Sequence, residues 1–193
     1  MGLLARLHRA LDHAFEVPPL GSLRRRARDR RFERGGEIHA FRGVFETYEA
    51  AHASAPTTLP TGYDNAASAE LYARDLDVGE YDYPALFWVG QSMQEGMRSV
   101  LDLGGSVGIK FVAFGKYLDF PSDLVWRVLE VPAVVKRGRE LALAYRGGGA
   151  LQFVGSISDV NGVDLLLASG SLQYLPKSLP EMMLSVTEIG PFA

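Results

Sequence analysis

The stretch from Val100 to Gly108, VLDLGGSVG, decides the fold of this 193-residue chain. An apolar start leads to Asp102 and a glycine cluster, and the run Ile109 to Phe114 can continue as a helix. Glycine permits positive φ and leaves space where a ligand approaches the backbone. A helix that begins after it presents free N–H groups. The stretch therefore predicts a strand, a glycine turn and a helix start, the first such turn of a nucleotide-type cofactor site.

Three other interpretations of the segment GGSVG have to be compared with the cofactor turn. It can be a tight turn without a ligand, since short glycine motifs occur by chance. The dinucleotide fingerprint G-x-G-x-x-G does not fit glycines at 104, 105 and 108. The nucleophile elbow G-x-S-x-G needs a histidine downstream of Ser106, but the four histidines all lie upstream, at 8, 13, 39 and 52. We favour the cofactor turn.

Length and composition predict a globular chain with one main domain and an appended segment. A hydrophobic content of 47% in 193 residues is enough for a core. The absence of cysteine excludes disulfides and cysteine-based metal or redox centres, and we predict no metal site. No apolar run approaches the roughly 18 residues of a membrane span, and charges interrupt the N-terminal segment where a signal peptide is apolar. We expect a cytoplasmic protein.

Charge divides the chain into a basic arm and an acidic body. Residues 1–34 hold nine arginines against four acids, or +5, and the rest holds eleven basic against nineteen acidic residues, or −8. The acidic body argues against specific nucleic-acid binding. Residues 1–37 are predicted to form a helical arm, with a helix from Gly2 to Phe15 and an arginine-rich run from Leu23 to Arg34. The arm either contacts an anionic membrane surface or is a solvated hairpin.

Residues 38–98 are predicted to form a helical and aromatic cap segment. Helices are expected over 46–51, 65–74 and 86–97, with a connector at 54–63 and a loop at 79–84. Four aromatic residues of this segment either line a pocket or belong to the core: Tyr63, Tyr81, Tyr83 and Trp88.

Residues 99–193 alternate between strand and helix patterns. After the glycine turn, strands are expected over 124–130, 151–154 and 162–168, and helices over 110–117, 132–144 and 179–186. This alternation predicts an α/β fold with a doubly wound, mostly parallel sheet, whose fourth strand is apolar enough to be buried on both faces. Glu130 ends the second strand, where a carboxylate can accept hydrogen bonds from both hydroxyls of a ribose.

These motifs resemble those of the class I S-adenosylmethionine-dependent methyltransferases. From about Phe41 to Leu175 the chain is more similar to a little-characterised bacterial family classed as methyltransferases. Six family motifs occur here in order: FRGVF (41–45), GYD (62–64), YDY (81–83), the glycine turn, VLEVP (128–132) and SGSLQYL (169–175). The resemblance implies a Rossmann-like sheet and S-adenosylmethionine as the cofactor.

The resemblance also implies roles for particular residues. The glycine turn would border the methionine part of the cofactor, Glu130 would accept from the ribose hydroxyls, and Val131 would flank the adenine. Ser156 would lie near the adenine edge. Three residues would lie beside the sulfonium or the acceptor: Ser169, Gln173 and Tyr174. The residues implied for the glycine turn are Asp102, Gly104, Gly105 and Gly108.

The resemblance names no methyl acceptor, and association with the family suggests a small molecule or a glycan-related compound. Methyl transfer from a sulfonium depends mainly on alignment, whereas a hydroxyl acceptor also needs a general base. Candidates for a catalytic role are Tyr174 and Gln173, and Asp164 or an N-terminal group is a further candidate for the base.

The chain departs from the class I pattern in its number of strands. Seven strands are typical, whereas only about four are predicted here, so the core over 99–193 is expected to lack its C-terminal strands. A truncated or degenerate binding module without turnover is therefore an alternative to an active enzyme. An NAD-linked oxidoreductase shares the strand–glycine–acid pattern but lacks the glycine spacing.

Overall fold

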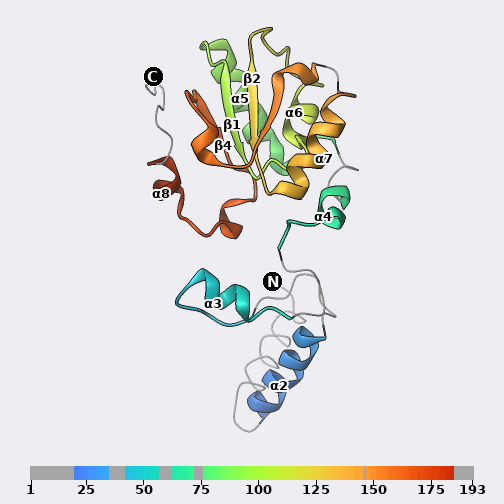
Figure 1. The fold of residues 1–193 in the computed structure, drawn as a ribbon, viewed down its shortest axis with the longest axis vertical. Coiled ribbons are helices and arrows are strands. Elements are labelled where there is room, and N and C mark those ends of the chain that lie inside the picture. Colours follow the sequence, from blue (N-terminus) through green and yellow to red (C-terminus); the bar gives the residue numbers. More distant parts are fainter. Residues whose placement is uncertain (1–19, 35–41, 57–61, 72–75, 146, 185–193) are drawn as a thin grey trace, which may run out of the picture. The chain divides into compact units, whose positions relative to one another are not determined.

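The computed structural model describes residues 20–34, 42–56, 62–71, 76–145 and 147–184 of the chain, which is shown in Figure 1. The chain divides into two compact units, Met1–Thr61 and Gly62–Ala193. Residues 62–98, which were predicted to belong to the cap segment, thus share a compact unit with the sheet. The predicted division of the chain into an arm, a cap and a cofactor-binding core, with boundaries after residues 37 and 98, stays a prediction. The helix predicted from Gly2 to Phe15 lies outside the described residues.

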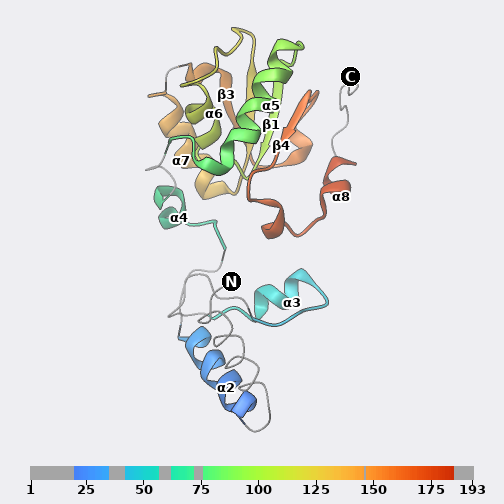
Figure 2. The same ribbon diagram turned by 180° about the vertical axis from the view of Figure 1, so that it is seen from behind.

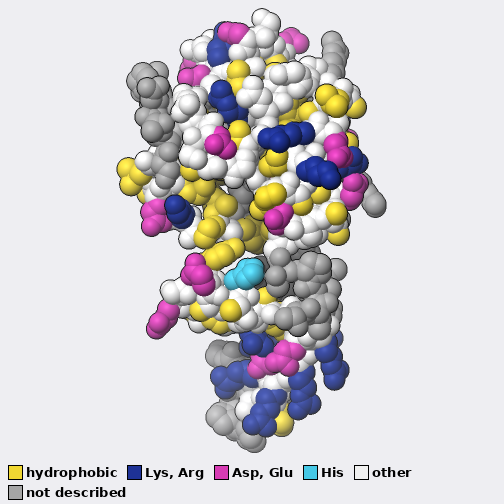
Figure 3. Space-filling model, viewed as in Figure 1, with side chains coloured by type: hydrophobic (Ala, Val, Ile, Leu, Met, Phe, Trp, Pro, Cys, Tyr) yellow, Lys and Arg dark blue, Asp and Glu magenta, His cyan; other side chains and the backbone are white. Residues whose placement is uncertain are grey.

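The first unit contains helices α2 (Leu20–Glu33) and α3 (Tyr48–Ala53). Figure 3 shows Lys and Arg side chains gathered over α2. This helix has almost no amphipathic character, so it lacks the apolar face with which an interfacial helix enters a membrane. Helix α3 begins two residues later than predicted because Thr47 Oγ1 accepts from Ala50 N at 3.1 Å and caps it.

The second unit is built on a four-stranded parallel sheet. Its strands are β1 (Ser99–Leu103), β2 (Val125–Leu129), β3 (Leu151–Val154) and β4 (Leu165–Leu167), in the order β3-β2-β1-β4. In the register, Val100 pairs with Trp126 on one side and with Leu165 on the other. The predicted α/β class and the parallel, Rossmann-like sheet are confirmed.

Helices of this unit cover both faces of the sheet. Figures 1 and 2 agree that α7 lies at the β3 edge, beside α4, and that α8 lies at the β4 edge. The helices are α4 (Ala66–Leu71), α5 (Tyr83–Gln94), α6 (Ile109–Phe114), α7 (Pro132–Ala142) and α8 (Leu179–Met183). Short 3-10 turns are η2 (Glu80–Asp82), η3 (Gly148–Ala150), η4 (Ile157–Asp159) and η5 (Leu172–Tyr174).

The two faces of the sheet bury different clusters of side chains. On one face Trp126 is completely buried among residues of α5, α6 and α7, and its ring lies 5.9 Å from those of Phe111 and Phe120. On the other face Leu101 and Leu103 pack against Met182 of α8. Because β1 is buried on both faces, its residues cannot move without disturbing both clusters.

Helix α5 and strand β4 also differ from the prediction. Helix α5 begins at Tyr83 and not at Leu86, because Pro84 occupies its first turn, where a missing N–H costs nothing. Strand β4 is shorter than predicted, and its three leucines are only half-buried. The prediction of a strand buried on both faces is wrong here, because β4 pairs with β1 alone among the described strands.

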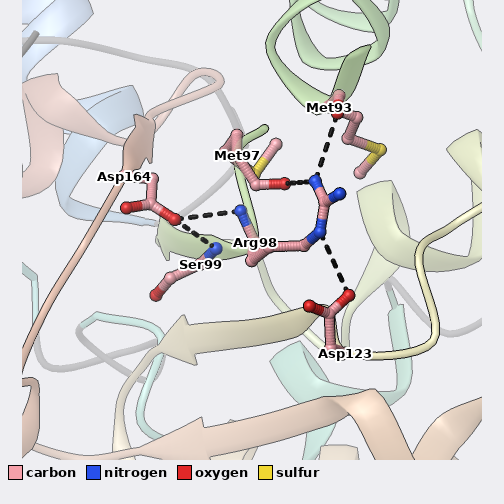
Figure 4. Close-up of polar contacts among 6 residues, drawn as sticks. All are labelled: Met93, Met97, Arg98, Ser99, Asp123 and Asp164. Carbon is pink, nitrogen blue, oxygen red and sulfur yellow. Dashed lines mark hydrogen bonds and ion pairs between the residues drawn. The ribbon is translucent and has the colours of Figure 1, made fainter. Parts of the chain in front are cut away.

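Polar contacts fasten β4 to β1 at the amino ends of the strands (Figure 4). The Asp164 carboxylate accepts from the backbone N–H groups of Arg98 and Ser99, both at 2.9 Å. The Arg98 guanidinium donates to the carbonyl oxygens of Met93 and Met97, at 3.2 and 2.8 Å, and pairs with Asp123 at 3.1 Å. The two Asp164 hydrogen bonds hold the start of β4 against β1, at the amino ends of the strands and opposite the glycine turn.

Candidate functional site

The loops that follow β1 and β4 touch at the carboxyl edge of the sheet. Gly104, at φ +67°, donates its N–H to Leu129 O at 2.9 Å. A Cβ on Gly104 would lie 2.4 Å from the Cβ of Ser171, so only glycine fits. The Ser171 hydroxyl donates to Leu103 O at 2.5 Å. Strand order reverses between β1 and β4, and such a switch point is where open α/β sheets bind ligands.

A cavity of about 260 Å³ opens at this switch point. Its walls come from the glycine turn, the end of β2, the loop after β4 and the segment that contains α4. The residues that line it include Asp102, Gly104, Gly105, Ser106, Lys110, Glu130, Val131, Ser169, Tyr63, Ser68 and Tyr174.

Asp102 lies at the floor of the cavity and is almost completely buried, with 1% of its surface exposed. Its Oδ2 accepts from Trp126 Nε1 at 3.2 Å. Burial raises the pKa of Asp102 from 3.8 to about 7, although the Trp126 hydrogen bond and the charge of Lys110 lower it. A Cβ on Gly105 would lie 2.3 Å from Asp102 Oδ2, so the turn passes directly over the carboxyl group.

Glu130 extends from the end of β2 to the glycine turn. Its Oε1 accepts from Ser106 N and its Oε2 from Val131 N, each at 3.0 Å. Burial raises the pKa of this carboxyl, whereas the two backbone hydrogen bonds lower it. A carboxylate has about four acceptor positions, so each oxygen can accept one more hydrogen bond. The group is therefore fixed in place and still able to bind two hydroxyls.

A segment distant in sequence forms the wall of the cavity opposite the sheet. Asp64 Oδ1 accepts from Ala133 N at 2.8 Å, at the start of α7, and Glu70 pairs with Arg137 at 2.6 Å. These contacts hold the segment from Gly62 to Leu71 against α7. Tyr63 then meets Tyr174 edge-on, with 5.3 Å between ring centroids.

A second ion pair connects the cavity to the turn before α5. Lys110, which lines the cavity, pairs with Asp82 at 2.5 Å, and both side chains are largely buried. Asp82 also accepts from Gly79 N at 3.0 Å. Lys110 thus donates to Asp82, whereas Asp102 accepts its hydrogen bond from the Trp126 indole.

The structure brings most of the predicted site residues together. Those that line the cavity are Asp102, Gly104, Gly105, Glu130, Val131, Ser169 and Tyr174. Their roles as ligand contacts stay predictions.

Gly108, Gln173 and Ser156 do not line this cavity. Gly108 starts α6 at φ +88°, with a Cβ position 2.7 Å from Leu151 Cδ2. Gln173 Nε2 donates to Gly170 O at 2.8 Å. Ser156 caps a 3-10 turn by accepting from Ser158 N at 3.3 Å.

Asp164 precedes β4 and is therefore at the opposite end of the strands from the cavity. There it accepts two backbone hydrogen bonds (Figure 4). As a general base for chemistry in the cavity, Asp164 is therefore excluded. Of the four aromatic residues, Tyr63 lines the cavity, whereas Tyr81, Tyr83 and Trp88 are 89%, 62% and 63% exposed. These three belong neither to this cavity nor to the core.

Several lining residues were not predicted as site residues: Ser106, Lys110, Ser68 and Ser171. Ser106 and Lys110 are within or just after the quoted stretch, so their position was a usable signal. Ser171 lies within the quoted motif SGSLQYL and had the same kind of signal. Ser68 had none, because its place in the wall depends on contacts between distant segments.

The cavity fits the nucleoside part of S-adenosylmethionine in its donor and acceptor groups. Glu130 offers acceptors for a diol, and the missing Cβ atoms of Gly104 and Gly105 leave the backbone accessible. Ser106 Oγ is buried in the cavity wall without a hydrogen-bond partner in the described part of the chain, which leaves a polar atom for a ligand. Among the described residues, no group of three His, Asp or Glu side chains is placed to hold a metal.

Comparisons with known proteins find similarity at the level of structure. No protein-family model and no curated protein matches the chain. Solved structures that resemble it include the mitomycin 7-O-methyltransferase MmcR, at 22% identity over 55% of this chain and 31% of that one, with a TM-score of 0.36. The CcbJ methyltransferase from Streptomyces caelestis is 22% identical over 55% of this chain and 42% of its own, with a TM-score of 0.38.

An O-methyltransferase family protein from Burkholderia thailandensis is 13% identical over 75% of this chain and 41% of its own, with a TM-score of 0.39. The chain therefore spans less than half the length of these three methyltransferases. The bacterial family suggested by the six sequence motifs stays a prediction. None of the helices in the described residues is long and apolar enough to cross a membrane.

Proposed function

We propose that the chain is an S-adenosylmethionine-dependent methyltransferase that acts on a small-molecule or glycan-related acceptor. One observation carries the proposal: Glu130 directly follows β2 at the carboxyl end of a parallel sheet, and its Oε1 accepts from Ser106 N in the glycine turn. An acid in this place is suited to a ribose diol. The six motifs of the sequence add support for the cofactor.

In the proposed reaction, the residues of the chain bind the cofactor and orient it toward the acceptor. S-adenosylmethionine supplies a methyl group on a positively charged sulfur. Glu130 accepts from the ribose hydroxyls, Val131 flanks the adenine, and the turn at Gly104 and Gly105 borders the methionine part. Alignment of the methyl carbon with the acceptor is the main contribution that such a site makes.

The acceptor is assigned to the side of the cavity at Ser169 and Tyr174. The paired rings of Tyr63 and Tyr174 offer an apolar surface against which a flat ring or the face of a sugar can pack. For a hydroxyl acceptor, the general base is assigned to Tyr174, one of the two tyrosines on this side of the wall.

Calorimetric titration with S-adenosylmethionine, S-adenosylhomocysteine and NAD tests the cofactor. We expect micromolar binding of the first two, weakened roughly tenfold or more in Glu130→Gln, because hydrogen bonds to a charged group are lost. Glu80→Gln, an exposed change on η2, is the matched control and should bind like the wild type. Binding of NAD alone, or unaltered binding by Glu130→Gln, would contradict the proposal.

Turnover is tested separately with cofactor labelled in its methyl group and a fractionated pool of small molecules and glycan precursors. Transfer of label to one compound identifies the acceptor. Cofactor binding without transfer to any compound favours a binding module without turnover.

A further inference from the structure

Ser106 has an unusual backbone conformation for its residue type. Its φ of +54° is the one positive value at a non-glycine residue in the part of the chain that the structure describes. In this region the Cβ approaches the carbonyl oxygen, a strain that glycine avoids. Gly104 and Gly108 adopt positive φ in the same turn. A serine between them therefore carries a conformational cost that a third glycine would not.

The Ser106 side chain is also unsatisfied. The residue is 9% exposed, and its Oγ is buried without a hydrogen-bond partner in the described residues. A buried hydroxyl without a partner destabilises the folded state, and native structures contain few of them. Backbone strain and an unpartnered hydroxyl thus both destabilise the folded state at one residue of the cavity wall. Such strained residues are found most often at sites that bind ligands.

The position of Ser106 next to Glu130 indicates which ligand atoms its hydroxyl meets. The N–H of Ser106 donates to Glu130 Oε1 at 3.0 Å, and three covalent bonds separate that nitrogen from Oγ. The hydroxyl therefore lies near the carboxylate, and both residues line the same cavity. Val131 N holds the second carboxylate oxygen at 3.0 Å, so the acceptor side of this pair is fixed.

We propose that Ser106 is a ligand-binding residue whose hydroxyl donates a hydrogen bond to a sugar oxygen of the nucleoside held by Glu130. Each hydroxyl of a cis-diol both donates and accepts. The Glu130 carboxylate can accept hydrogen bonds from the diol, and the neighbouring Ser106 hydroxyl can donate one to a diol oxygen. The inference rests on the proposed function and adds a residue to its sugar subsite.

The test uses the full chain with Ser106→Ala and Ser106→Gly, and two probes. S-adenosylhomocysteine contains the nucleoside and the amino acid, whereas 5′-methylthioadenosine contains the nucleoside alone. We expect both variants to bind both probes roughly two- to tenfold more weakly, the loss of one neutral hydrogen bond. Ser122→Ala, an exposed change beyond the opposite edge of the sheet, is the control and should bind like the wild type.

Thermal melting without ligand separates a binding role from a structural one. Ser106→Gly relieves the backbone strain, so its melting midpoint should rise by roughly 1 to 4 °C while its affinity falls. A serine kept for stability alone would give a lower midpoint in this variant, which would overturn the inference. Ser106→Ala keeps the Cβ and the backbone strain but removes the buried hydroxyl that has no partner, so its midpoint should be equal to that of the wild type or higher.

The two probes separate the ways in which the inference can fail. If only S-adenosylhomocysteine binds more weakly, the hydroxyl meets the amino-acid part and the sugar assignment is wrong. If neither probe is affected, Ser106 is not a ligand contact. A wild-type chain that binds neither probe refutes the proposed function together with this inference. If the wild type binds both probes and the Ser106 variants bind them equally well, only this inference is refuted and the proposed function is unaffected.

Discussion

Burial of Asp102 should make the folded protein less stable as the pH rises, and replacing it with asparagine should remove that dependence. The pKa of this carboxyl is about 7 in the folded chain, against 3.8 for a solvated aspartate. Between these values the folded state binds a proton that the unfolded state has lost. Stability from this group is therefore complete below about pH 4 and is lost as the pH rises to about 7.

The magnitude follows from the two pKa values. The interval from 3.8 to about 7 corresponds to about 4 kcal/mol in the free energy of unfolding, at 1.36 kcal/mol per pH unit. About 3 kcal/mol of this falls between pH 5 and pH 8. For a chain of this length that amount corresponds to roughly 6 to 12 °C in the melting midpoint. Asp102→Asn keeps an oxygen for the Trp126 indole N–H but carries no charge.

The assay is urea unfolding of the wild type and Asp102→Asn at pH 5, 6.5 and 8, because the difference between the two chains cancels the titration of other groups. We expect the variant to gain about 3 kcal/mol relative to the wild type from pH 5 to pH 8. The linear extrapolation should use a common slope for both chains. A difference that stays constant, or that favours the wild type at pH 8, would refute the reasoning that Asp102 is buried and protonated near neutral pH.

Three further changes test other parts of the structure. Gly138→Ala improves helix propensity in α7 but places a Cβ 2.2 Å from the Phe153 ring, so the melting midpoint of this variant should fall by several degrees. The control is Gly155→Ala, whose Cβ meets no atom within 4 Å and which should melt like the wild type. Asp82→Ala leaves Lys110 without its buried partner and should destabilise the chain by about 3 kcal/mol in urea unfolding, a loss that a change within 0.5 kcal/mol would contradict. If the basic arm contacts anionic membranes, binding of the full chain to anionic vesicles should weaken steeply from 50 to 500 mM salt in sedimentation, because α2 is rich in arginine and has no apolar face. Binding that does not depend on salt would indicate an inserted apolar face.

Sequence alone determined the class of fold and the place of the candidate site. Local patterns were sufficient for this because a glycine turn after an apolar run, and apolar runs that alternate with helix patterns, depend on residues close together in the chain. The acid at the end of β2 followed from the same alternation. Glu130 and the glycine turn consequently met as predicted, at the carboxyl edge of a parallel sheet.

Only the tertiary structure decided which distant residues share the cavity. Asp164 and Tyr174 follow one another closely in the chain, yet the direction of β4 puts them at opposite ends of the sheet. Tyr63 enters the wall because Asp64 binds the start of α7. The unpartnered hydroxyl of Ser106 became visible only once its neighbours were in place. Burial and hydrogen-bond satisfaction are properties of packing between distant segments, so periodicity along the chain does not encode them.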